Sequence, residues 1–468
     1  MLDTTKTGLT AQKEIDAKAG ILENLAMKIW EAPETAYNEV KACAWMEEVL
    51  KNEGFEVVTG YAGVPTAIKA TWGSGKPILG FLGEYDALPG MSQKVSVEKD
   101  PVVLGDPGHA CGHNLLGTAH VGAVIGMKKE MEEKGLKGTI IYYGCPAEEV
   151  LTGKPMMARG GGFSEGLDAV MAWHPGTANR ITMGTMTALN TAKFHFKGVT
   201  AHAGGDPHNG RSALDAAELM NVGANFLREH VTSDVRIHYV LTESGTAPNI
   251  VPDRATNWYY VRAMSREAVV TTYERLIKVA EGAAHMTETK VEIEYMGGCY
   301  NTLQNKVLCD LLYGVMKDEV ALPVWTAEEL KFAEELDKVS ANYDRLLAAG
   351  KVEEGTHIHS EVGPIVYEDG YGSTDVGDVQ HIAPGVFFGT ATENLGAAGH
   401  SWQFSSCSGH SIGTKGMLQA AKVMAVTGIK LLEDASILDA AKKEFDEVMR
   451  GKSYVCPITP EVPVPQPK

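Results

Sequence analysis

Hydrophobic residues recur at the spacing of an amphipathic helix in two stretches near the start of the chain, 11–30 and 37–54. After them, short apolar runs of strand length alternate with segments of helical periodicity. Such alternation is typical of a mixed α/β domain with a largely parallel sheet, and this is the fold class that the pattern predicts.

Three of the apolar runs end in acidic or histidine residues. The runs span residues 77–82, 139–143 and 169–173. The residues that follow them are Glu84, Asp86, Glu148, Glu149 and His174. In open α/β sheets, ligands bind outside the carboxyl ends of the strands, so we expect a functional site at this edge. The segment GHACGHN lies between the first two runs and is expected to lead into a helix over 115–133.

The pattern changes from about residue 188. The expected elements are a strand at 192–198, a helix at 212–229, strands at 236–242 and 256–262, a helix at 266–287 and a strand at 290–295. Ser212 followed by Asp215 is typical of a helix N-terminus. The order β-α-β-β-α-β predicts a ferredoxin-like domain over 188–299, inserted into a domain built from 1–187 and 300–468.

Beyond the insertion, helices and strands are expected to alternate again until about residue 435. The stretch 320–369 is more polar and is predicted to be a peripheral elaboration, with a capping box at Thr326 (TAEE) opening a helix. The tail CPITPEVPVPQPK has too many prolines for a helix or an inner strand, so we expect it to be extended.

Length and composition agree with a globular protein of two domains. The chain has 468 residues, 44% hydrophobic and 22% charged, which exceeds the usual size of a single core. It has no apolar stretch near the roughly 20 residues that a membrane helix needs. The first sixteen residues show no apolar segment behind a basic start, so no secretory signal and a cytoplasmic location are expected.

The cysteine count and the net charge exclude further classes. Seven irregularly spaced cysteines do not make a disulfide framework. A formal charge of −18 argues against nucleic acid as a partner. It does not exclude a small anionic substrate, because metal ions and an arginine can reverse the sign locally.

Cys111 and His113 stand two apart in a glycine-flanked turn, where a thiolate and an imidazole can converge on one transition metal. A purely structural turn is the alternative. If Glu148 and Glu149 lie in an extended segment, their side chains point in opposite directions, so that one can bind a metal while the other faces a water molecule. The alternative for this pair is a solvated acidic surface.

Histidines supply the remaining candidate ligands. His174 follows an apolar strand, where a buried core histidine is the alternative interpretation. His400 stands in GAAGHSWQ, after a strand-like run at 386–388, and His410 follows ten residues later. Composition and spacing do not choose between these two.

Several motifs together resemble one family in order and spacing. They are GEYDALPG, GHACGHNLLGTAH, YGCPAEE, AWHP, AHAGGDPHNGRSALDA, PNIVPD, GSTDVGDV, GHSWQ and TKGMLQAAK. The chain resembles the dinuclear metallo-amidohydrolases and exopeptidases that include carboxypeptidase G, aminoacylase and the indole-acetyl-amino-acid hydrolases. The resemblance extends from the N-terminal helices to the proline-rich tail.

The resemblance implies a set of site residues and cofactors. Two divalent ions per subunit, Mn²⁺ or Zn²⁺, are expected on Cys111, His113, Glu149, His174 and His400. His400 is preferred over His410 because HSWQ matches the C-terminal ligand motif of the family. The other implied residues are Glu148 as general base, Asp86 as support of the metal site, His202 as a group reaching into the partner subunit's active site, and Asn249 and Arg262 as binders of the scissile carbonyl and the substrate carboxylate.

The implied reaction is hydrolysis of the amide bond of an N-aroyl or N-acyl amino acid, with p-aminobenzoyl-glutamate as the leading candidate. A dipeptidase or an aminoacylase on the same scaffold is the enzymatic alternative. A non-catalytic partner subunit is the alternative of another class, and the complete ligand set argues against it. A homodimer through a lid and dimerisation domain at 188–299 is expected, with a heterodimer with a related subunit as the alternative.

Two features depart from the family pattern. Many relatives have an aspartate where Glu84 stands in GEYDALPG, and the stretch 320–369 has no counterpart in the shorter members.

Overall fold

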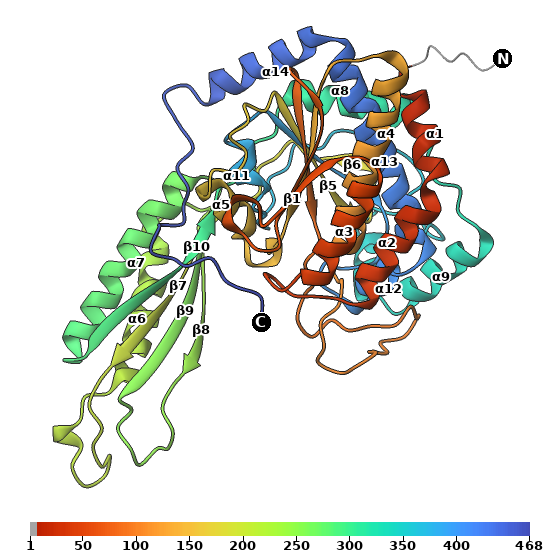
Figure 1. Ribbon diagram of the computed structural model, residues 1–468. Helices are drawn as coiled ribbons and strands as arrows, with labels where there is room; N and C mark the ends of the chain where they lie inside the picture. The colour runs from red at the N-terminus through yellow and green to blue at the C-terminus, as the bar shows by residue number, and fades with distance from the viewer. Residues whose placement is uncertain (1–6) are drawn as a thin grey trace.

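The computed structural model describes residues 7–468 and contains two β-sheets, each with its own helices (Figure 1). The first six residues, which belong to the stretch expected to carry no secretory signal, lie outside the described part. The large sheet has the order β1-β2-β4-β3-β5-β11-β6. Its strands are β1 (Glu56–Thr59), β2 (Ile68–Ser74), β3 (Ile78–Glu84), β4 (Gly138–Cys145), β5 (Ala169–Gly176), β6 (Arg180–Ile181) and β11 (Gly385–Ala391). The four central strands β4, β3, β5 and β11 are parallel and the outer ones antiparallel, which confirms the predicted mixed α/β fold.

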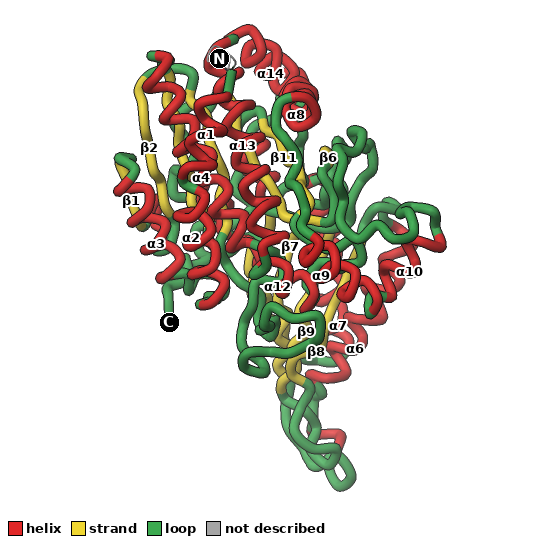
Figure 2. The backbone as a smooth tube through the Cα atoms, turned by 90° about the vertical axis from the view of Figure 1, so that its right-hand side faces the viewer, coloured by secondary structure: helices red, strands yellow, loops and turns green. Residues whose placement is uncertain are grey.

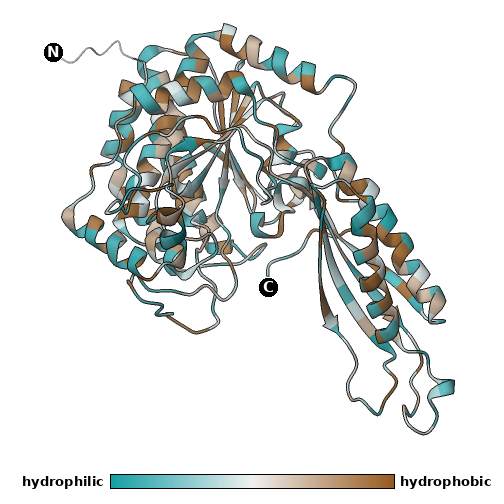
Figure 3. Cartoon of the chain, turned by 180° about the vertical axis from the view of Figure 1, so that it is seen from behind, coloured by the Kyte–Doolittle hydropathy of each residue, from teal (hydrophilic) through white to brown (hydrophobic). Residues whose placement is uncertain are grey.

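The central strands are apolar without interruption because both faces of the sheet are buried. In β4, Ile140 and Tyr142 join the core under one layer of helices, whereas Ile141 and Tyr143 join a second core on the other face. Figure 3 shows hydrophobic residues concentrated along these strands. The first face is covered by α1 (Leu9–Ala17), α2 (Ala19–Glu31), α3 (Val40–Asn52), α4 (His113–Lys134), α8 (Lys306–Asp318) and α13 (Ser411–Glu433). The second is covered by α5 (Gly153–Arg159), α11 (Val376–Gln380) and part of the extended C-terminal tail.

The single helix expected over 11–30 is wrong, because the chain breaks at Lys18 into α1 and α2. Tertiary contacts hold the two pieces separately. The Glu130 carboxylate of α4 accepts hydrogen bonds from the backbone N–H groups of Gly8 and Ala11, at 2.7 and 2.9 Å. Lys18 itself pairs with Glu53 at 2.6 Å. Among the helices of residues 7–468, none is long and apolar enough to cross a membrane.

The second sheet has the order β10-β7-β9-β8 and is antiparallel throughout. Its elements are β7 (Ala188–Lys197), α6 (Ala213–Leu227), β8 (Arg236–Glu243), β9 (Arg254–Ala263), α7 (Arg266–Met286) and β10 (Lys290–Cys299). The predicted β-α-β-β-α-β order is thus correct, and Ser212 caps α6 by accepting a hydrogen bond from Asp215 N at 3.1 Å. Helices α6 and α7 cover one face of this sheet, and the loops around 198–212 and 244–253 form its free end (Figure 1).

The stretch 320–369 contains the predicted capping box of Thr326 and Glu329, which opens α9 (Ala327–Lys338), followed by α10 (Ala341–Ala348). These helices are peripheral, as predicted (Figure 2). The chain that follows these helices is not peripheral, because it runs beside residues 179–186. Isolated β-bridges join Asn179 to Val362, Thr182 to Val366 and Met186 to Gly370. This segment therefore ends at the junction of the two sheets. The C-terminal part adds α12 (Trp402–Ser408) and α14 (Ala435–Val448), so the regular elements extend beyond residue 435.

Candidate metal centre

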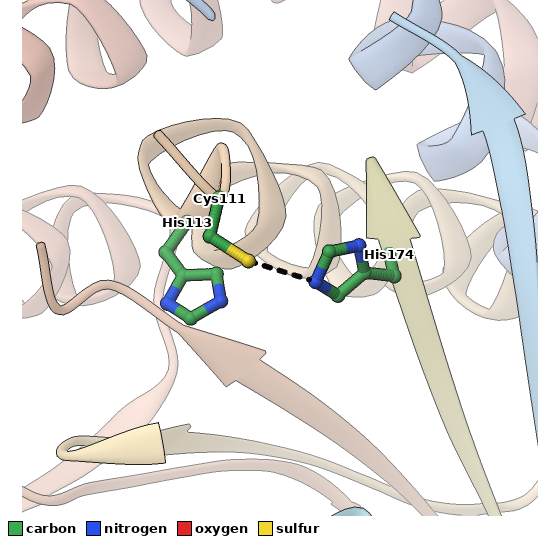
Figure 4. Close-up of side chains that lie close together, drawn as sticks. All are labelled: Cys111, His113 and His174. Carbon is green, nitrogen blue, oxygen red and sulfur yellow. Dashed lines mark hydrogen bonds between the residues drawn. The ribbon is translucent and has the colours of Figure 1, made fainter. Parts of the chain in front are cut away.

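Cys111 and His113 are placed by a tight turn at the start of α4. Gly112 adopts a left-handed conformation with φ of 72°, and a Cβ there would lie 2.9 Å from Pro175 Cγ, so only glycine fits. The turn brings Cys111 Sγ to 3.3 Å from His174 Nε2 at the end of β5 (Figure 4). Donor atoms of Cys111, His113 and His174 lie within 4.8 Å of one another, the proximity that a shared metal ion requires.

Glu148 and Glu149 lie in a short 3₁₀ turn (Glu148–Val150), and the extended segment expected for them is wrong. The left-handed residues Ala147 and Leu151, with φ of 60° and 57°, flank this turn. Both carboxylates approach His113, but only that of Glu149 also approaches His400. Glu148 Oε2 lies 3.8 Å from His113 Nε2, and Glu149 Oε2 lies 3.6 Å from His400 Nε2.

The structure brings His400, and not His410, to this cluster. Donor atoms of Cys111, Glu149 and His400 lie within 4.8 Å of one another, so Cys111 is common to two groups of ligand atoms. His400 has a φ of 57° and a side chain that is 56% exposed, an unusual conformation of the kind found at functional sites. His410 instead stacks on Phe332 with ring centroids 4.1 Å apart.

Asp86 is buried behind the cluster and orients two of its members. Its Oδ1 lies 3.0 Å from His113 Nδ1, and its Oδ2 accepts a hydrogen bond from Glu149 N at 2.9 Å. A carboxylate on the second ring nitrogen fixes the tautomer and orientation of a metal-binding histidine. His113 Nε2 and Glu149 Oε1 are buried without a hydrogen-bond partner among the described residues. They are therefore free to bind a metal.

Burial and charge shift the acid–base equilibria of the cluster. Burial raises the pKa of Glu149 to about 7. Burial, together with repulsion from Glu84 and Asp375, holds the pKa of Glu148 well above its usual value. Burial lowers the pKa of His174 to about 4, which keeps this imidazole neutral and able to bind a metal. Crowded acids beside neutral imidazole and a thiol form a donor set suited to divalent transition metals.

Lys154 and Asp375 belong to this region and were not predicted from the sequence. Lys154 is fully buried, and its Nζ donates to Glu84 and Asp375. Glu84 Oε2 in turn lies 3.5 Å from His113 Nε2. A lone lysine after an acidic pair carries no recognisable signal, although Asp375 lies within the motif GSTDVGDV. Glu84, which stands where many relatives of the family have an aspartate, is thus paired with the buried cation of Lys154.

Lys154→Met is expected to lower the free energy of unfolding by about 3–5 kcal/mol, because it leaves Glu84 and Asp375 buried without a counter-charge. The measurement is urea unfolding followed by intrinsic tryptophan fluorescence. Lys76→Met is the matched control, since its ion pair with Asp168 lies at the surface and contributes at most about 1 kcal/mol. Equal effects of the two substitutions would contradict this role of Lys154.

The remaining predicted residues lie apart from the cluster, His202 and Asn249 together and Arg262 separately from them. His202 and Asn249 occupy neighbouring loops at the free end of the second sheet, where Ala203 N donates to Asn249 O at 3.0 Å. Arg262 lies near the opposite end of β9, eight residues or about 27 Å from Arg254 at the free end. There its Nη1 donates to Ser373 Oγ at 2.8 Å.

A mixed α/β sheet with a thiol, imidazoles and carboxylates gathered at its carboxyl edge defines a metal-binding hydrolase. Comparison with known proteins agrees with this class. Residues 188–285 match the model of the peptidase dimerisation domain of the M20 family. The chain is 39% identical to a subunit of the p-aminobenzoyl-glutamate hydrolase of Escherichia coli, over 96% of each chain. The protein therefore belongs to the M20 family of metallo-peptidases and amidohydrolases and is an enzyme that hydrolyses amide bonds.

Two further relatives are more distant. The chain is 29% identical to the Xaa-Arg dipeptidase of Mus musculus, over 93% of this chain and 91% of that protein. A dinuclear metal-binding peptidase of the M20 family from Bacillus subtilis has the same fold, with a TM-score of 0.58 at 19% identity. The superposition covers 89% of this chain and 99% of that one. The predicted family and enzyme class are confirmed.

Proposed function

We propose that the protein hydrolyses the amide bond of N-aroyl or N-acyl amino acids, with p-aminobenzoyl-glutamate as its substrate. The cluster of Cys111, His113 and His174, with Glu148 beside it, carries this proposal. The likeness to a p-aminobenzoyl-glutamate hydrolase supports the choice of acyl group. The likeness to a dipeptidase keeps a dipeptide substrate as the second candidate.

Two divalent ions, Mn²⁺ or Zn²⁺, would be held by five residues. These are Cys111, His113, Glu149, His174 and His400. When bound, such ions supply Lewis-acid polarisation of the amide carbonyl and acidify a water molecule. Glu148 is the general base of the proposed reaction, which would accept a proton from the attacking water and donate it to the leaving nitrogen. Asp86 keeps His113 in the ligating orientation through the 3.0 Å contact with Nδ1.

His400→Ala is expected to weaken the affinity for the metal by at least roughly 10- to 100-fold. The reason is that the ligand group of Cys111, Glu149 and His400 loses one of its three members. The measurement is metal content by plasma emission spectrometry after dialysis against graded chelator. His410→Ala is the matched control and should keep the wild-type metal content. The reverse result would assign the ligand role to His410.

A dimer explains why His202 and Asn249 lie far from the cluster of their own chain. β8 is an edge strand on which Val240 is 55% exposed, and Phe226 on the adjacent α6 is 71% exposed. Exposed apolar edges of this kind favour pairing with a second copy. Antiparallel pairing of two β8 strands places the free end of one second sheet beside the Arg262 end of the other. His202 and Asn249 of one subunit would then stabilise the oxyanion in its partner's site.

The same geometry fits a homodimer or a heterodimer with a related chain, and the Escherichia coli relative is itself named as one subunit of its enzyme. We favour the homodimer, because one chain carries both the ligand cluster and the free-end residues. We propose two domains. Residues 1–187 and 300–468 form the metal-binding catalytic domain, and residues 188–299 form the lid and dimerisation domain. A cytoplasmic location is also proposed, and all seven cysteines are free thiols, as is usual in a reducing compartment.

Product analysis tests the proposed reaction. The protein, loaded with Mn²⁺ or Zn²⁺, is incubated with p-aminobenzoyl-glutamate and with a panel of N-acyl amino acids and dipeptides. Release of p-aminobenzoate and glutamate is the expected result. Cleavage of dipeptides alone would favour the dipeptidase, and cleavage of none would favour the non-catalytic partner subunit.

A further inference from the structure

Two arginines lie directly opposite each other on the second sheet. Arg236 of β8 is the register partner of Arg262 of β9, so both side chains stand on the same face. Their neighbours Ile237 and Val261 belong to the core under α6 and α7, so the arginines occupy the face away from these helices. Like charges directly opposite each other are destabilising, so this pair calls for a compensating anion.

Among the described residues, no carboxylate lies within ion-pair distance of either arginine. Within residues 7–468, the only arginine ion pair is that of Arg211 with Glu288, although the chain has 60 acidic residues. The acid nearest in sequence is Asp234. A hydrogen bond from Thr232 and, to a smaller extent, the charge of Arg236 lower its pKa, but it forms no ion pair with either arginine, and its Oδ2 accepts a hydrogen bond from Met264 N at 2.9 Å. The pair is therefore an electropositive site in a strongly acidic protein.

The end of the segment 362–373 completes the walls of this site. The Tyr371 ring lies over the Arg236 guanidinium at 4.2 Å, and Ser373 Oγ accepts from Arg262 Nη1 at 2.8 Å. Arg236 Nη1 donates to the carbonyls of Ser233 and Val235, at 2.7 and 3.0 Å. Since a guanidinium carries five N–H donors, both arginines keep free donors in a fixed orientation.

The arginine pair lies on the metal side of the second sheet. Ser373 precedes Asp375 by two residues, and Asp375 hydrogen bonds both the backbone N and Nζ of Lys154. Lys154 also contacts Glu84, the neighbour of His113. The segment from Ser373 to Asp375, followed by the buried contacts of Lys154 and Glu84, thus connects the arginine pair to the metal cluster.

We propose that Arg236 and Arg262 together bind the two carboxylates of the substrate, so that the amino acid released is acidic. This inference rests on the proposed amide hydrolysis and assigns its specificity to Arg236, Tyr371 and Arg262. The Cα atoms of opposed strand residues are about 5 Å apart, so two arginine side chains on the same face can reach the two carboxylates of one small ligand. A basic amino acid, such as the arginine named for the mouse relative, would be repelled.

The test compares kcat/KM for p-aminobenzoyl-glutamate and p-aminobenzoyl-glutamine, which differ at the side-chain carboxylate. The wild-type enzyme is expected to prefer the glutamate compound by about 10- to 100-fold, the effect of one charge-assisted contact. Arg236→Met should reduce this ratio to within a few-fold of unity, and Tyr371→Leu should lower it several-fold. Lys193→Met removes a cation from the same face of the sheet and should keep the wild-type ratio.

Each outcome decides between the two proposals. Cleavage of both compounds with equal kcat/KM by the wild-type enzyme overturns the role of the arginine pair but supports amide hydrolysis. Preservation of the ratio in a folded Arg236→Met protein, checked by circular dichroism, also overturns it. If Arg236→Met does not fold, the glutamate-to-glutamine ratio of kcat/KM in the wild-type and Tyr371→Leu enzymes tests the role of the arginine pair. Absence of cleavage of every N-acyl amino acid overturns the proposed function, and this inference with it.

Discussion

Replacing Glu148 by glutamine is expected to lower kcat by about 100- to 10,000-fold, the range typical of a lost general base. Glutamine has nearly the same shape, but it cannot take a proton from water or pass one to the leaving nitrogen. Burial and the neighbouring carboxylates of Glu84 and Asp375 raise the pKa of Glu148, which makes it a stronger base than an exposed glutamate. The measurement is steady-state hydrolysis of p-aminobenzoyl-glutamate with matched metal loading.

The control for this prediction is another buried glutamate. Glu393 is fully buried, and both of its carboxylate oxygens lack a hydrogen-bond partner among the described residues. Burial raises its pKa well above the usual value, so glutamine closely mimics its neutral form. Glu393→Gln should therefore keep most of the wild-type kcat. A Glu148→Gln enzyme with substantial activity and full metal content would assign the base to another residue.

His202→Ala is expected to lower kcat by about 100- to 1,000-fold, as removal of an oxyanion donor does. Because His202 lies at the free end of the second sheet, its loss should affect the partner subunit's site and not that of its own chain. Mixing His202→Ala with Glu148→Gln subunits then creates heterodimers with one intact site. With random exchange, activity should recover to at most about a quarter of the wild-type value, since half of the dimers are mixed and each has one working site.

A second histidine in the same loop provides the control for this experiment. The side chain of His208 is 77% exposed, and His208→Ala should leave kcat unchanged. Subunit exchange is verified with differently tagged chains. A mixture that exchanges subunits but stays inactive would place His202 in the site of its own chain or outside catalysis. Wild-type activity of His202→Ala alone would remove it from the reaction.

Much of the site could be anticipated from the sequence because its residues follow apolar strands. Glu84, Glu148 and His174 each end or follow a central parallel strand, and the carboxyl ends of parallel strands meet at one edge. The tight turn at Gly112 likewise follows from local sequence, since only glycine permits its conformation. The order of elements over 188–299 was predictable from hydrophobic periodicity alone.

Other features depend on contacts between residues far apart in the chain, and no local pattern predicts them. The hydrophobic periodicity predicts one N-terminal helix. The Glu130 carboxylate, more than a hundred residues away in the chain, instead binds the start of α1 and holds it apart from α2. Lys154 gains its place from burial between Glu84 and Asp375. The geometry of Glu148 and Glu149 comes from a 3₁₀ turn that their sequence does not indicate.

The sequence by itself determined the fold class, the strand ends that carry the chemistry and the residue types suited to divalent metals. These follow from periodicity and from side-chain chemistry, which are local properties. Only the tertiary structure decided that Lys154 neutralises the buried acids and that Tyr371 and Arg236 meet. Distance between side chains is set by packing of the whole chain, so such choices appear only once the chain is folded.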